Sequence, residues 1–529
     1  MPERIAAADH LSRPHTGPIL DVEGMDLSEL LTGLDVLGVS GNPAAKVTSV
    51  AYDSRQVKPG TMFVAIAGEK TDGNRFVFDA VARGAAAVAS ELPRPWDARW
   101  ATIGVAPADL PASVSWVQVR QARRALAVIS ANYFGRPAHA LKLIGITGTN
   151  GKTTTAYLVD SILRAAGYRT GLLGTVEYRL PNSSQPAKHT TPESLELQGF
   201  LAGAREAGGS HVVFEVSSHA LAMDRVWGCP FEAAVFTNLT RDHLDFHKDF
   251  DDYFAAKRRL FEGTGGGAPG LGVINVDDPR GRELLGLARR RITYGLNNGA
   301  DLTAKRFALS FSGLEFTAQT PAGKLDVRSR LVGRINVYNI LAALGVGVGL
   351  GLPVAALEAG VRQLESVPGR FERIDEGQPF LVVVDYAHTD DALRNLLQTA
   401  RELLKNGRLI TVFGCGGDRD RVKRPLMGEA AGRLSNFVVL TSDNPRSEDP
   451  RRIINDILVG LQRTDAPYSV EPDRARAIAL ALDEARAGDV VLLAGKGHET
   501  YQVLADRTID FDDRQVARRE LARRGYAKS

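Results

Sequence analysis

The stretch Leu143-Ile-Gly-Ile-Thr-Gly-Thr-Asn-Gly-Lys-Thr-Thr-Thr155 decides the fold of this chain. The apolar run from Leu141 to Ile146 predicts a buried strand, and the residues from Thr154 to Ala166 predict a helix. The glycine-rich turn between them resembles turns whose backbone N–H groups, with the helix N-terminus, cradle a polyphosphate. We therefore predict a nucleoside-triphosphate site at this turn.

The turn departs from the strict G-x-x-x-x-G-K-[ST] pattern, because Ile146 holds the place of the first glycine. Glycines stand instead at Gly145 and Gly148. Lys152 adds a point charge for the phosphates, and the hydroxyl of Thr153 is a candidate ligand for a magnesium ion. An ordinary strand–helix turn gives no reason for adjacent Gly-Lys-Thr-Thr, so phosphate binding remains the prediction.

Composition limits the class of protein. A chain of 529 residues is too long for one core and predicts roughly three domains. The hydrophobic content of 44% and charged content of 24% are those of a soluble globular protein, and a net charge of +3 does not suggest nucleic-acid binding. The two cysteines, Cys229 and Cys415, lie far apart in sequence, which fits a reducing cytosol and offers no metal-binding spacing.

Two segments bear on localisation. Residues 1–19 carry charges and prolines but lack the apolar centre of a secretory signal, so we expect a cytoplasmic protein. Residues 340–357 are uncharged and reach the length of a membrane span. Glycines and Pro353 interrupt them, so we predict a buried helix that ends near 349–351, a second helix from Pro353, and no membrane insertion.

The order of apolar and polar segments predicts an α/β protein of three domains. The proposed boundaries are 1–137 for a small α/β domain, 138–367 for the domain with the phosphate loop and a mainly parallel sheet, and 368–529 for a third domain of alternating strands and helices. In the last of these, strands are predicted at Leu381–Val384, Leu409–Phe413, Phe437–Leu440 and Val490–Leu493, separated by helices. Strands that alternate with helices predict a parallel, doubly wound sheet.

Polar residues follow the predicted strands, at the sheet edge where such folds bind ligands. Glu215 stands near the end of the strand Val212–Val216 and is well placed for a metal ion. The loop Asn238-Leu-Thr-Arg-Asp-His-Leu-Asp-Phe-His247 is too polar for a core. Its histidines would suit zinc, but no cysteine supports that reading, and magnesium prefers oxygen ligands. Lys257 lies on a predicted helix, where a lone lysine is usually a solvated charge.

The combined motifs resemble the Mur ligase family, the ATP-dependent enzymes that build the peptidoglycan stem peptide. Besides the phosphate loop, the resemblance covers Glu215-Val-Ser-Ser-His219, Asn238-x-x-x-Asp242-His243, Asn336-x-x-Asn339, Gly369-Arg-Phe-Glu372, Asp385-Tyr-Ala-His388 and Gly495-Lys-Gly-His498. The motifs occur in family order and span the chain from Asp53 to Glu499. The resemblance implies a UDP-binding domain, a central ATPase domain and a closing Rossmann-like domain.

The implied reaction has two steps. ATP phosphorylates the D-glutamyl side-chain carboxylate of UDP-N-acetylmuramoyl-L-alanyl-D-glutamate, and the amine of an amino acid then displaces phosphate. Asp443-Asn-Pro-Arg446 resembles the motif of members that add meso-diaminopimelate, whereas lysine-adding members lack the arginine. Diaminopimelate carries one more carboxylate than lysine, and a guanidinium pairs bidentately with a carboxylate.

The resemblance also implies roles for single residues. The catalytic set is Lys152, Glu215, His243, Lys257 and His388, with Lys257 carbamylated by carbon dioxide; the magnesium ligands are Thr153, Glu215, His243 and Lys257. ATP contacts are implied for Gly148, Thr149, Asn150, Gly151, Lys152, Thr153, Thr154, Asn339, Arg370 and Asp385. Contacts to the UDP precursor are implied for Tyr52, Ser54, Glu69, Lys70, Thr71, Thr190, Thr191, Ser217 and Arg225. Diaminopimelate contacts are implied for Arg419, Asp443, Asn444, Pro445, Arg446, Gly495 and Glu499.

Four other functions are alternatives to a diaminopimelate-adding ligase. A lysine-adding ligase or a folylpolyglutamate synthase would share the phosphate loop and the third domain. A nucleic-acid motor would show basic stripes and more aromatic residues than 7%. A non-catalytic regulator would have lost Lys152, Glu215 or Lys257, and all three are present. We expect a monomeric ligase.

Overall fold

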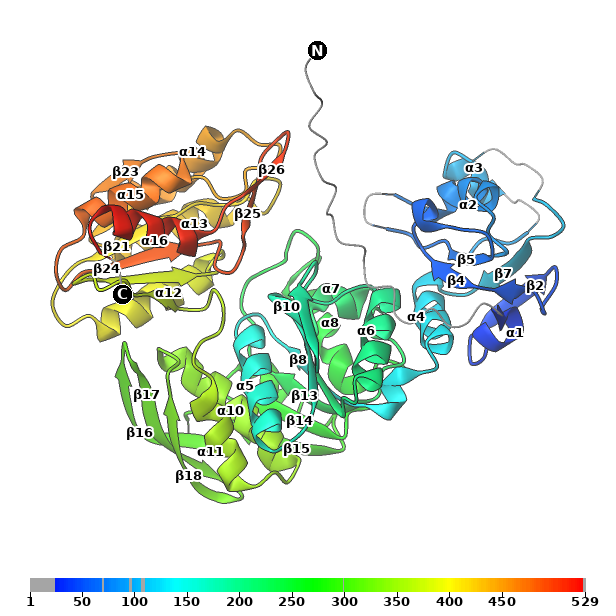
Figure 1. Cartoon of the computed structure of the whole chain (residues 1–529), viewed down its shortest axis with the longest axis horizontal. Helices are drawn as coiled ribbons and strands as arrows, with labels where there is room; N and C mark the ends of the chain where they lie inside the picture. Colours follow the sequence, from blue (N-terminus) through cyan, green and yellow to red (C-terminus); the bar gives the residue numbers. More distant parts are fainter. Residues whose placement is uncertain (1–23, 69–70, 95–97, 106–109, 298, 527–529) are drawn as a thin grey trace, which may run out of the picture.

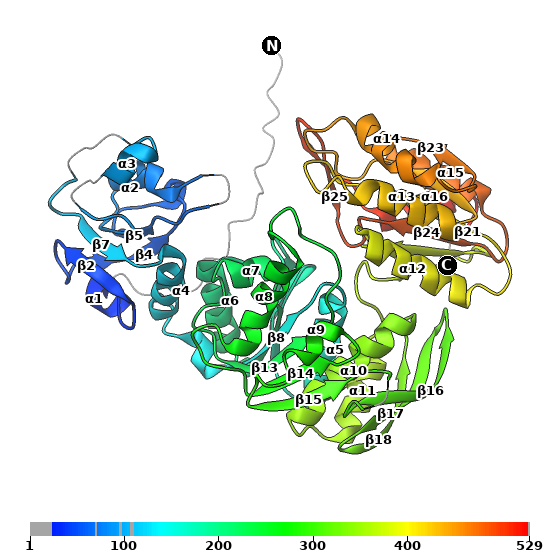
Figure 2. The same cartoon turned by 180° about the vertical axis from the view of Figure 1, so that it is seen from behind.

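The computed structural model describes residues 24–68, 71–94, 98–105, 110–297 and 299–526. They form three α/β bodies, and the body with the phosphate loop lies between the other two in both views (Figures 1 and 2). The expected α/β architecture with mainly parallel sheets is therefore confirmed.

The N-terminal body has a five-stranded sheet in the order β2-β7-β6-β5-β4. The four strands β7, β6, β5 and β4 are parallel, and β2 is antiparallel. The strands are β2 (Val36–Ser40), β4 (Ser49–Ala51), β5 (Thr61–Val64), β6 (Ala87–Ser90) and β7 (Ser115–Val119), and a short pair is formed by β1 (Met25–Asp26) and β3 (Lys46–Val47). The helices are α1 (Leu27–Leu30), α2 (Val77–Ala82), α3 (Ala98–Thr102) and α4 (Ala122–Tyr133).

The central body has an eight-stranded sheet in the order β11-β10-β9-β12-β8-β13-β14-β15. The strands β9, β12, β8, β13, β14 and β15 are parallel to one another. Its strands are β8 (Lys142–Thr147), β9 (Thr170–Leu173), β10 (Glu177–Leu180), β11 (Ser183–Pro186), β12 (His211–Glu215), β13 (Phe231–Phe236), β14 (Leu271–Asn275) and β15 (Arg290–Tyr294). Its helices are α5 (Lys152–Ala165), α6 (Ser194–Glu206), α7 (Ser218–Ala222), α8 (Phe250–Glu262), α9 (Pro279–Arg282), α10 (Arg334–Gly349) and α11 (Val354–Gln363).

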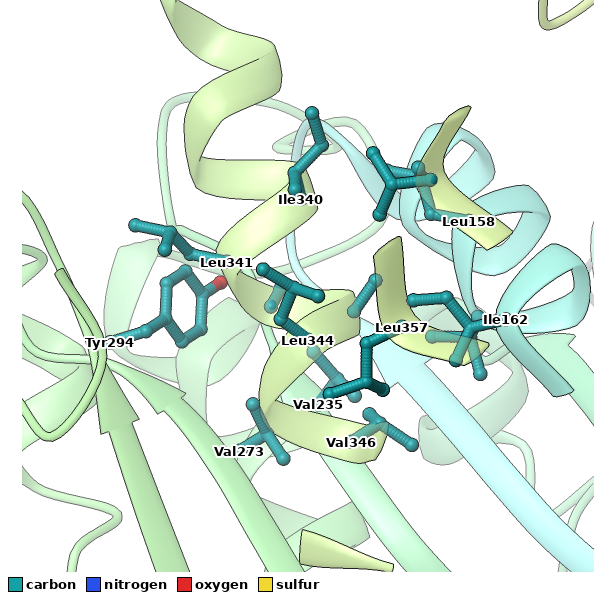
Figure 3. Close-up of a cluster of buried hydrophobic side chains, with 14 of the residues drawn as sticks. Leu158, Ile162, Val235, Val273, Tyr294, Ile340, Leu341, Leu344, Val346 and Leu357 are labelled. Carbon is teal, nitrogen blue, oxygen red and sulfur yellow. The ribbon is translucent and has the colours of Figure 1, made fainter. Parts of the chain in front are cut away.

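Apolar side chains cover both faces of this central sheet. On one face, Leu158 and Ile162 of α5, Leu344 of α10 and Leu357 of α11 pack with Val273 of β14 (Figure 3). On the other, helices α6, α7 and α8 pack against alternate residues of the same strands. Burial on both faces explains the nearly continuous apolar strands, because helices leave neither side of a parallel sheet to water.

The uncharged segment 340–357 behaves as the sequence predicted. It contributes the buried part of α10 and then the start of α11, with the break at Gly351 and Pro353. No helix among the described residues is long and apolar enough to cross a membrane.

An antiparallel sheet that the sequence analysis did not predict follows the central sheet. It consists of β16 (Thr303–Ser310), β17 (Gly313–Thr320) and β18 (Gly323–Ser329). In β18 exposed and buried residues alternate, as in a sheet that faces water on one side.

The C-terminal body has a six-stranded sheet in the order β19-β20-β24-β21-β22-β23, parallel except for β19. The four predicted strands are present as β20 (Leu381–Asp385), β21 (Leu409–Phe413), β22 (Phe437–Leu440) and β24 (Val490–Ala494). The sequence analysis missed the edge strands β19 (Glu372–Ile374) and β23 (Tyr468–Val470) and the hairpin of β25 (Tyr501–Val503) and β26 (Thr508–Asp510). The helices are α12 (Asp390–Leu403), α13 (Lys423–Leu434), α14 (Pro450–Leu461), α15 (Arg474–Glu484) and α16 (Asp513–Arg523).

Candidate active site

The phosphate loop lies between the end of β8 and the start of α5. Gly148 has a φ of 144°, and a Cβ atom there would lie 1.8 Å from Oγ1 of Thr237. Only glycine fits this position, since any side chain would collide with the neighbouring strand end. The ammonium of Lys152 donates hydrogen bonds to the carbonyl oxygens of Gly148 (3.0 Å) and Thr149 (2.8 Å), so its charge lies over the loop.

A buried carboxylate stands beside this loop. Glu215 ends β12, next to β8, and is 1% exposed. Its Oε2 accepts hydrogen bonds from the hydroxyls of Thr153 (3.0 Å) and Thr175 (3.1 Å), and its Oε1 accepts one from the backbone N–H of Thr175 (2.8 Å). All three donors are neutral, so the negative charge of Glu215 is available to a cation at the phosphate site.

Lys257 is the second unusual charge. It lies on α8, is 1% exposed, and donates a hydrogen bond of 2.7 Å to the carbonyl oxygen of Gly148. Its ammonium lies 4.3 Å from the centre of the Tyr253 ring. No ion pair to Lys257 is formed within the part of the chain that the structure describes. Burial, and then the charge of Lys152, hold the pKa of Lys257 well below its usual value.

The polar loop after β13 brings a histidine cluster to the same edge. His243 adopts a left-handed backbone conformation (φ 53°), and its Nε2 lies 3.3 Å from Oδ2 of Asp242. The ring of His219 lies 4.8 Å from that of His243. Burial lowers the pKa of His243 to about 3, so this imidazole is neutral near pH 7 and has a lone pair for a metal ion or a proton.

The C-terminal body contributes the other side of the phosphate site. Nη2 of Arg370 donates to Oγ1 of Thr153 (3.2 Å), and Nδ2 of Asn150 donates to Oδ2 of Asp391 (2.9 Å). These two bonds connect the phosphate loop to the segment before β19 and to the first turn of α12. Domains that meet across a phosphate site in this way can exclude water from it.

Two neighbouring cavities occupy the space between the central and C-terminal bodies. The smaller has a volume of about 260 Å³ and is lined by the phosphate loop together with Glu215, Asn339, Arg370 and Asp385. The larger has a volume of about 1010 Å³ and extends from β11 to the hairpin residues beside β24. Their shared lining contains Thr175, Thr190, Ser217, Asp242, His243, Tyr386, His388 and Thr389. A group transferred between ligands of the two cavities would pass this wall.

The expected amino-acid contacts gather at one end of the larger cavity. Its lining includes Arg419, Asp443, Asn444, Arg446, Gly495 and Glu499. Arg446 has a φ of 51° and donates from Nη1 to the carbonyl oxygen of Gly417 (2.9 Å). Pro445 is the exception, because it lies behind the lining and its carbonyl oxygen accepts the N–H of Glu448. Two guanidinium groups and two carboxylates at one site suit a zwitterion that itself carries more than one carboxylate and an ammonium group.

The expected precursor contacts divide into two groups. Thr190, Thr191, Ser217 and Arg225 line the larger cavity from the central body, whereas the expected amino-acid contacts line it from the C-terminal body. Tyr52, Ser54 and Thr71 lie in the N-terminal body, outside the lining of both cavities. The Tyr52 hydroxyl connects the two bodies by donating to Oε1 of Glu196 on α6 (2.8 Å). Glu69 and Lys70 lie outside the described residues.

Three polar residues of this cleft escaped the sequence analysis. Lys423, at the start of α13, lines the larger cavity and donates to the carbonyl oxygen of His388 (2.8 Å). Asp391 binds the phosphate loop, and Lys496 is fully buried behind the cavity. Lys496 could have been found from the sequence, because it lies inside the Gly495–Glu499 motif. Lys423 and Asp391 lie at the starts of helices, outside any motif, so the sequence does not indicate them.

Matches to known proteins cover all three bodies of the chain. Three family models match consecutive parts of the chain: the catalytic domain of the Mur ligase family at residues 46–134, the Mur ligase middle domain at 146–347, and the Mur ligase glutamate ligase domain at 369–497. The UDP-N-acetylmuramoyl-L-alanyl-D-glutamate–2,6-diaminopimelate ligase of Solibacter usitatus is 55% identical over 95% of this chain and 99% of its own length. The chain belongs to the Mur ligase family.

Two further relatives support this assignment. The ligase of the same name from Geobacillus thermodenitrificans is 44% identical and covers 94% of this chain and 100% of its own length. A solved structure of such a ligase superposes with a TM-score of 0.65 at 33% identity, covering 95% of this chain and all of that one. The expected resemblance and three-domain fold of the Mur ligase family are thus confirmed.

The donor atoms at the phosphate loop fit the magnesium ion that the family implies. Magnesium keeps several waters and binds one or two carboxylates and substrate phosphates, so it does not need a cage of protein ligands. The described residues contain no group of three or more His, Cys, Asp or Glu side chains that would form such a cage. Glu215 and the Thr153 hydroxyl, 3.0 Å apart beside the phosphate loop, supply the small oxygen set that is required.

The geometry at Gly148 yields a test of the phosphate loop. Gly148→Ala should weaken ATP binding by roughly 5- to 100-fold, because a strained backbone position costs about 1–3 kcal/mol and the loop must shift to relieve the contact with Thr237. Affinity for a fluorescent ATP analogue, measured by anisotropy, checks this. Gly286→Ala is the control, since a Cβ atom there meets nothing within 4 Å. Equal affinities of both variants for the ATP analogue would show that the loop does not bind the nucleotide.

Proposed function

We propose that the protein joins meso-2,6-diaminopimelate to the D-glutamyl side-chain carboxylate of UDP-N-acetylmuramoyl-L-alanyl-D-glutamate, with ATP converted to ADP and phosphate. The observation that carries this proposal is the shared wall between a phosphate-loop cavity and a cavity with Arg419, Arg446 and Glu499 at one end. Relatives named for this reaction, 55% and 44% identical over nearly the whole chain, support it.

The first chemical step is phosphoryl transfer, which depends on positioning and charge neutralisation more than on covalent help from the protein. In the proposal, Lys152 and the backbone of residues 148–154 hold the β- and γ-phosphates, and Asn339, Arg370 and Asp385 hold the rest of the nucleotide. Magnesium bound at Thr153 and Glu215 would neutralise charge on the phosphates. The precursor lies along Thr190, Thr191, Ser217 and Arg225, which brings its carboxylate oxygen to the γ-phosphorus and yields an acyl phosphate and ADP.

The second step is attack by the amine of diaminopimelate on the acyl carbon, after which phosphate leaves with the former carboxylate oxygen. Arg419 and Arg446 each pair with a carboxylate of the amino acid, and Glu499 pairs with an ammonium group. His388 lies in the wall between the cavities, with its Nδ1 2.9 Å from the carbonyl oxygen of Tyr386. In this position its imidazole would orient the transferred phosphoryl group.

Lys257 has a separate place in this proposal. A buried ammonium with one carbonyl acceptor and a nearby lysine is an unfavourable arrangement. The ammonium first loses a proton, and reaction of the neutral amine with carbon dioxide then forms an N–C bond and releases a second proton, so that the cation becomes a carbamate anion. A carbamate beside Gly148, with His243, would complete the oxygen and nitrogen ligands for magnesium.

We further propose that the enzyme works as a monomer in the cytoplasm. One chain supplies every residue that the proposed reaction uses at the two cavities, so the proposal requires no second copy. Both cysteines are free and buried, which is compatible with a reducing compartment.

The direct test is a comparison of acceptors. Purified protein with magnesium, ATP and UDP-N-acetylmuramoyl-L-alanyl-D-glutamate receives either meso-diaminopimelate or L-lysine, and phosphate release and product mass are measured. The proposal predicts turnover with diaminopimelate only. Turnover with lysine would contradict the assigned substrate, and no turnover with either would contradict the reaction.

The proposed carbamate predicts a chemical rescue. Lys257→Ala should be nearly inactive, and short-chain carboxylates such as formate or acetate should restore part of the activity because they replace the lost anion. Lys248→Ala, at an exposed position nearby, is the control and should behave as wild type. Full activity of Lys257→Ala without added carboxylate would exclude the carbamate from the reaction.

The role of Arg446 predicts a selective defect. Arg446→Ala should raise the KM for diaminopimelate, with a loss of roughly 2–5 kcal/mol for an unpaired buried charge, and should leave the KM for ATP nearly unchanged. Steady-state kinetics with each substrate varied in turn provide the measurement. Arg452→Ala, an exposed arginine of α14, is the matched control. An equal rise of both KM values would place Arg446 outside the amino-acid site.

A further inference from the structure

Lys496 is a fully buried lysine that the proposed reaction does not use. It lies between Gly495 and Glu499, both of which line the larger cavity, but it is 0% exposed and is not part of the lining. Its ammonium donates to Oε2 of Glu499 (3.1 Å) and to Oδ1 of Asn444 (3.2 Å). A buried lysine is rare unless its charge is paired, and here the partner is Glu499, a residue of the cavity lining.

The same three side chains form a closed network. Nδ2 of Asn444 also donates to Oε2 of Glu499 (2.9 Å), and Oδ1 of Asn444 also accepts the backbone N–H of Val503 (3.0 Å). Oε2 of Glu499 is therefore held by two donors. Among the described residues, no side chain or backbone group donates to Oε1.

The network also governs the charge of the carboxyl group. Burial raises the pKa of Glu499, the neighbouring Asp443 raises it further, and Lys496 opposes both effects. Without the ammonium of Lys496, two carboxyl groups would share a buried site, and such pairs resist double ionisation. Lys496 thus affects both the orientation of the Glu499 carboxylate and its charge.

We infer that Lys496 is a positioning residue for amino-acid recognition. It favours the ionised form of Glu499 and fixes Oε2 against Asn444, so that Oε1 faces the cavity and accepts the distal ammonium of the incoming amino acid. This inference rests on the proposed function. It assigns Lys496 no contact with substrate, because Glu499 and Asn444 lie in the cavity lining and Lys496 lies behind them.

The test separates a positioning role from general damage. Lys496→Met should raise the KM for diaminopimelate by about 10- to 100-fold, the loss seen when residues that orient metal ligands from behind are replaced. The KM values for ATP and the UDP precursor should stay within about twofold of wild type, as differences this small are below 0.5 kcal/mol. Lys405→Met, at an exposed position of the same domain, is the control.

A second acceptor supplies the decisive comparison. L-2-Aminopimelate lacks the distal amine, so its affinity, measured as acceptor or competitive inhibitor, should be the same for wild type and Lys496→Met. A similar loss for both amino acids would overturn the inference, as would an unchanged KM for diaminopimelate. Failure of wild type to use diaminopimelate would instead contradict the proposed function.

The inference can also be tested if Lys496→Met does not fold. Lys496→Gln removes the charge but keeps a hydrogen-bond donor beside Asn444 and Glu499, and it should likewise raise the KM for diaminopimelate with little effect on L-2-aminopimelate. Combining either variant with Glu499→Gln should add less than about twofold to the loss of Glu499→Gln alone, because coupled residues are not additive. Full additivity would show that Lys496 acts independently of Glu499.

Discussion

The hydrogen bond between the buried carboxylate of Glu215 and the hydroxyl of Thr153 is the contact on which the site depends. It joins the end of β12 to the first turn of α5, and Thr153 in turn accepts a hydrogen bond from Arg370 of the C-terminal body. A parallel sheet makes this possible, because its strands end at one edge beside the helix N-termini that attract phosphate. The negative charge, the phosphate loop and the closing domain therefore meet at one point.

The cleft concentrates backbone strain and unusual charge. Three of its non-glycine lining residues, His243, Phe371 and Arg446, have left-handed backbone conformations, which are uncommon outside functional segments. The buried lysine Lys257 donates to the carbonyl oxygen of Gly148 in the phosphate loop, and the buried lysine Lys496 donates to Glu499 behind the lining of the larger cavity. The left-handed residues and the buried lysines are energetically unfavourable, and the contacts around them hold them in place. The positions of charged groups in the cleft are therefore fixed before a ligand binds.

Sequence alone predicted the parts of the molecule with strong local signals. The structure confirms the strand, turn and helix around the phosphate loop, the four predicted strands of the C-terminal sheet and the two helices predicted in residues 340–357. The sheet β16–β18 was missed although Leu325 and Val327 alternate with polar residues, and short edge strands such as β23 give too few residues for a pattern. The burial of Lys496 was not predictable, because it results from packing between segments about fifty residues apart. The roles of the site residues remain predictions.

The path of the carboxylate oxygen tests the central claim that phosphate passes from ATP to the precursor across the wall shared by the two cavities. Both oxygens of the D-glutamyl γ-carboxylate are labelled with ¹⁸O, and the reaction is run with ATP and diaminopimelate. The mass of the released phosphate is then measured by mass spectrometry. The account predicts one labelled oxygen in each phosphate released, because the acyl phosphate loses phosphate together with that oxygen. Unlabelled phosphate from a reaction that forms product would contradict it.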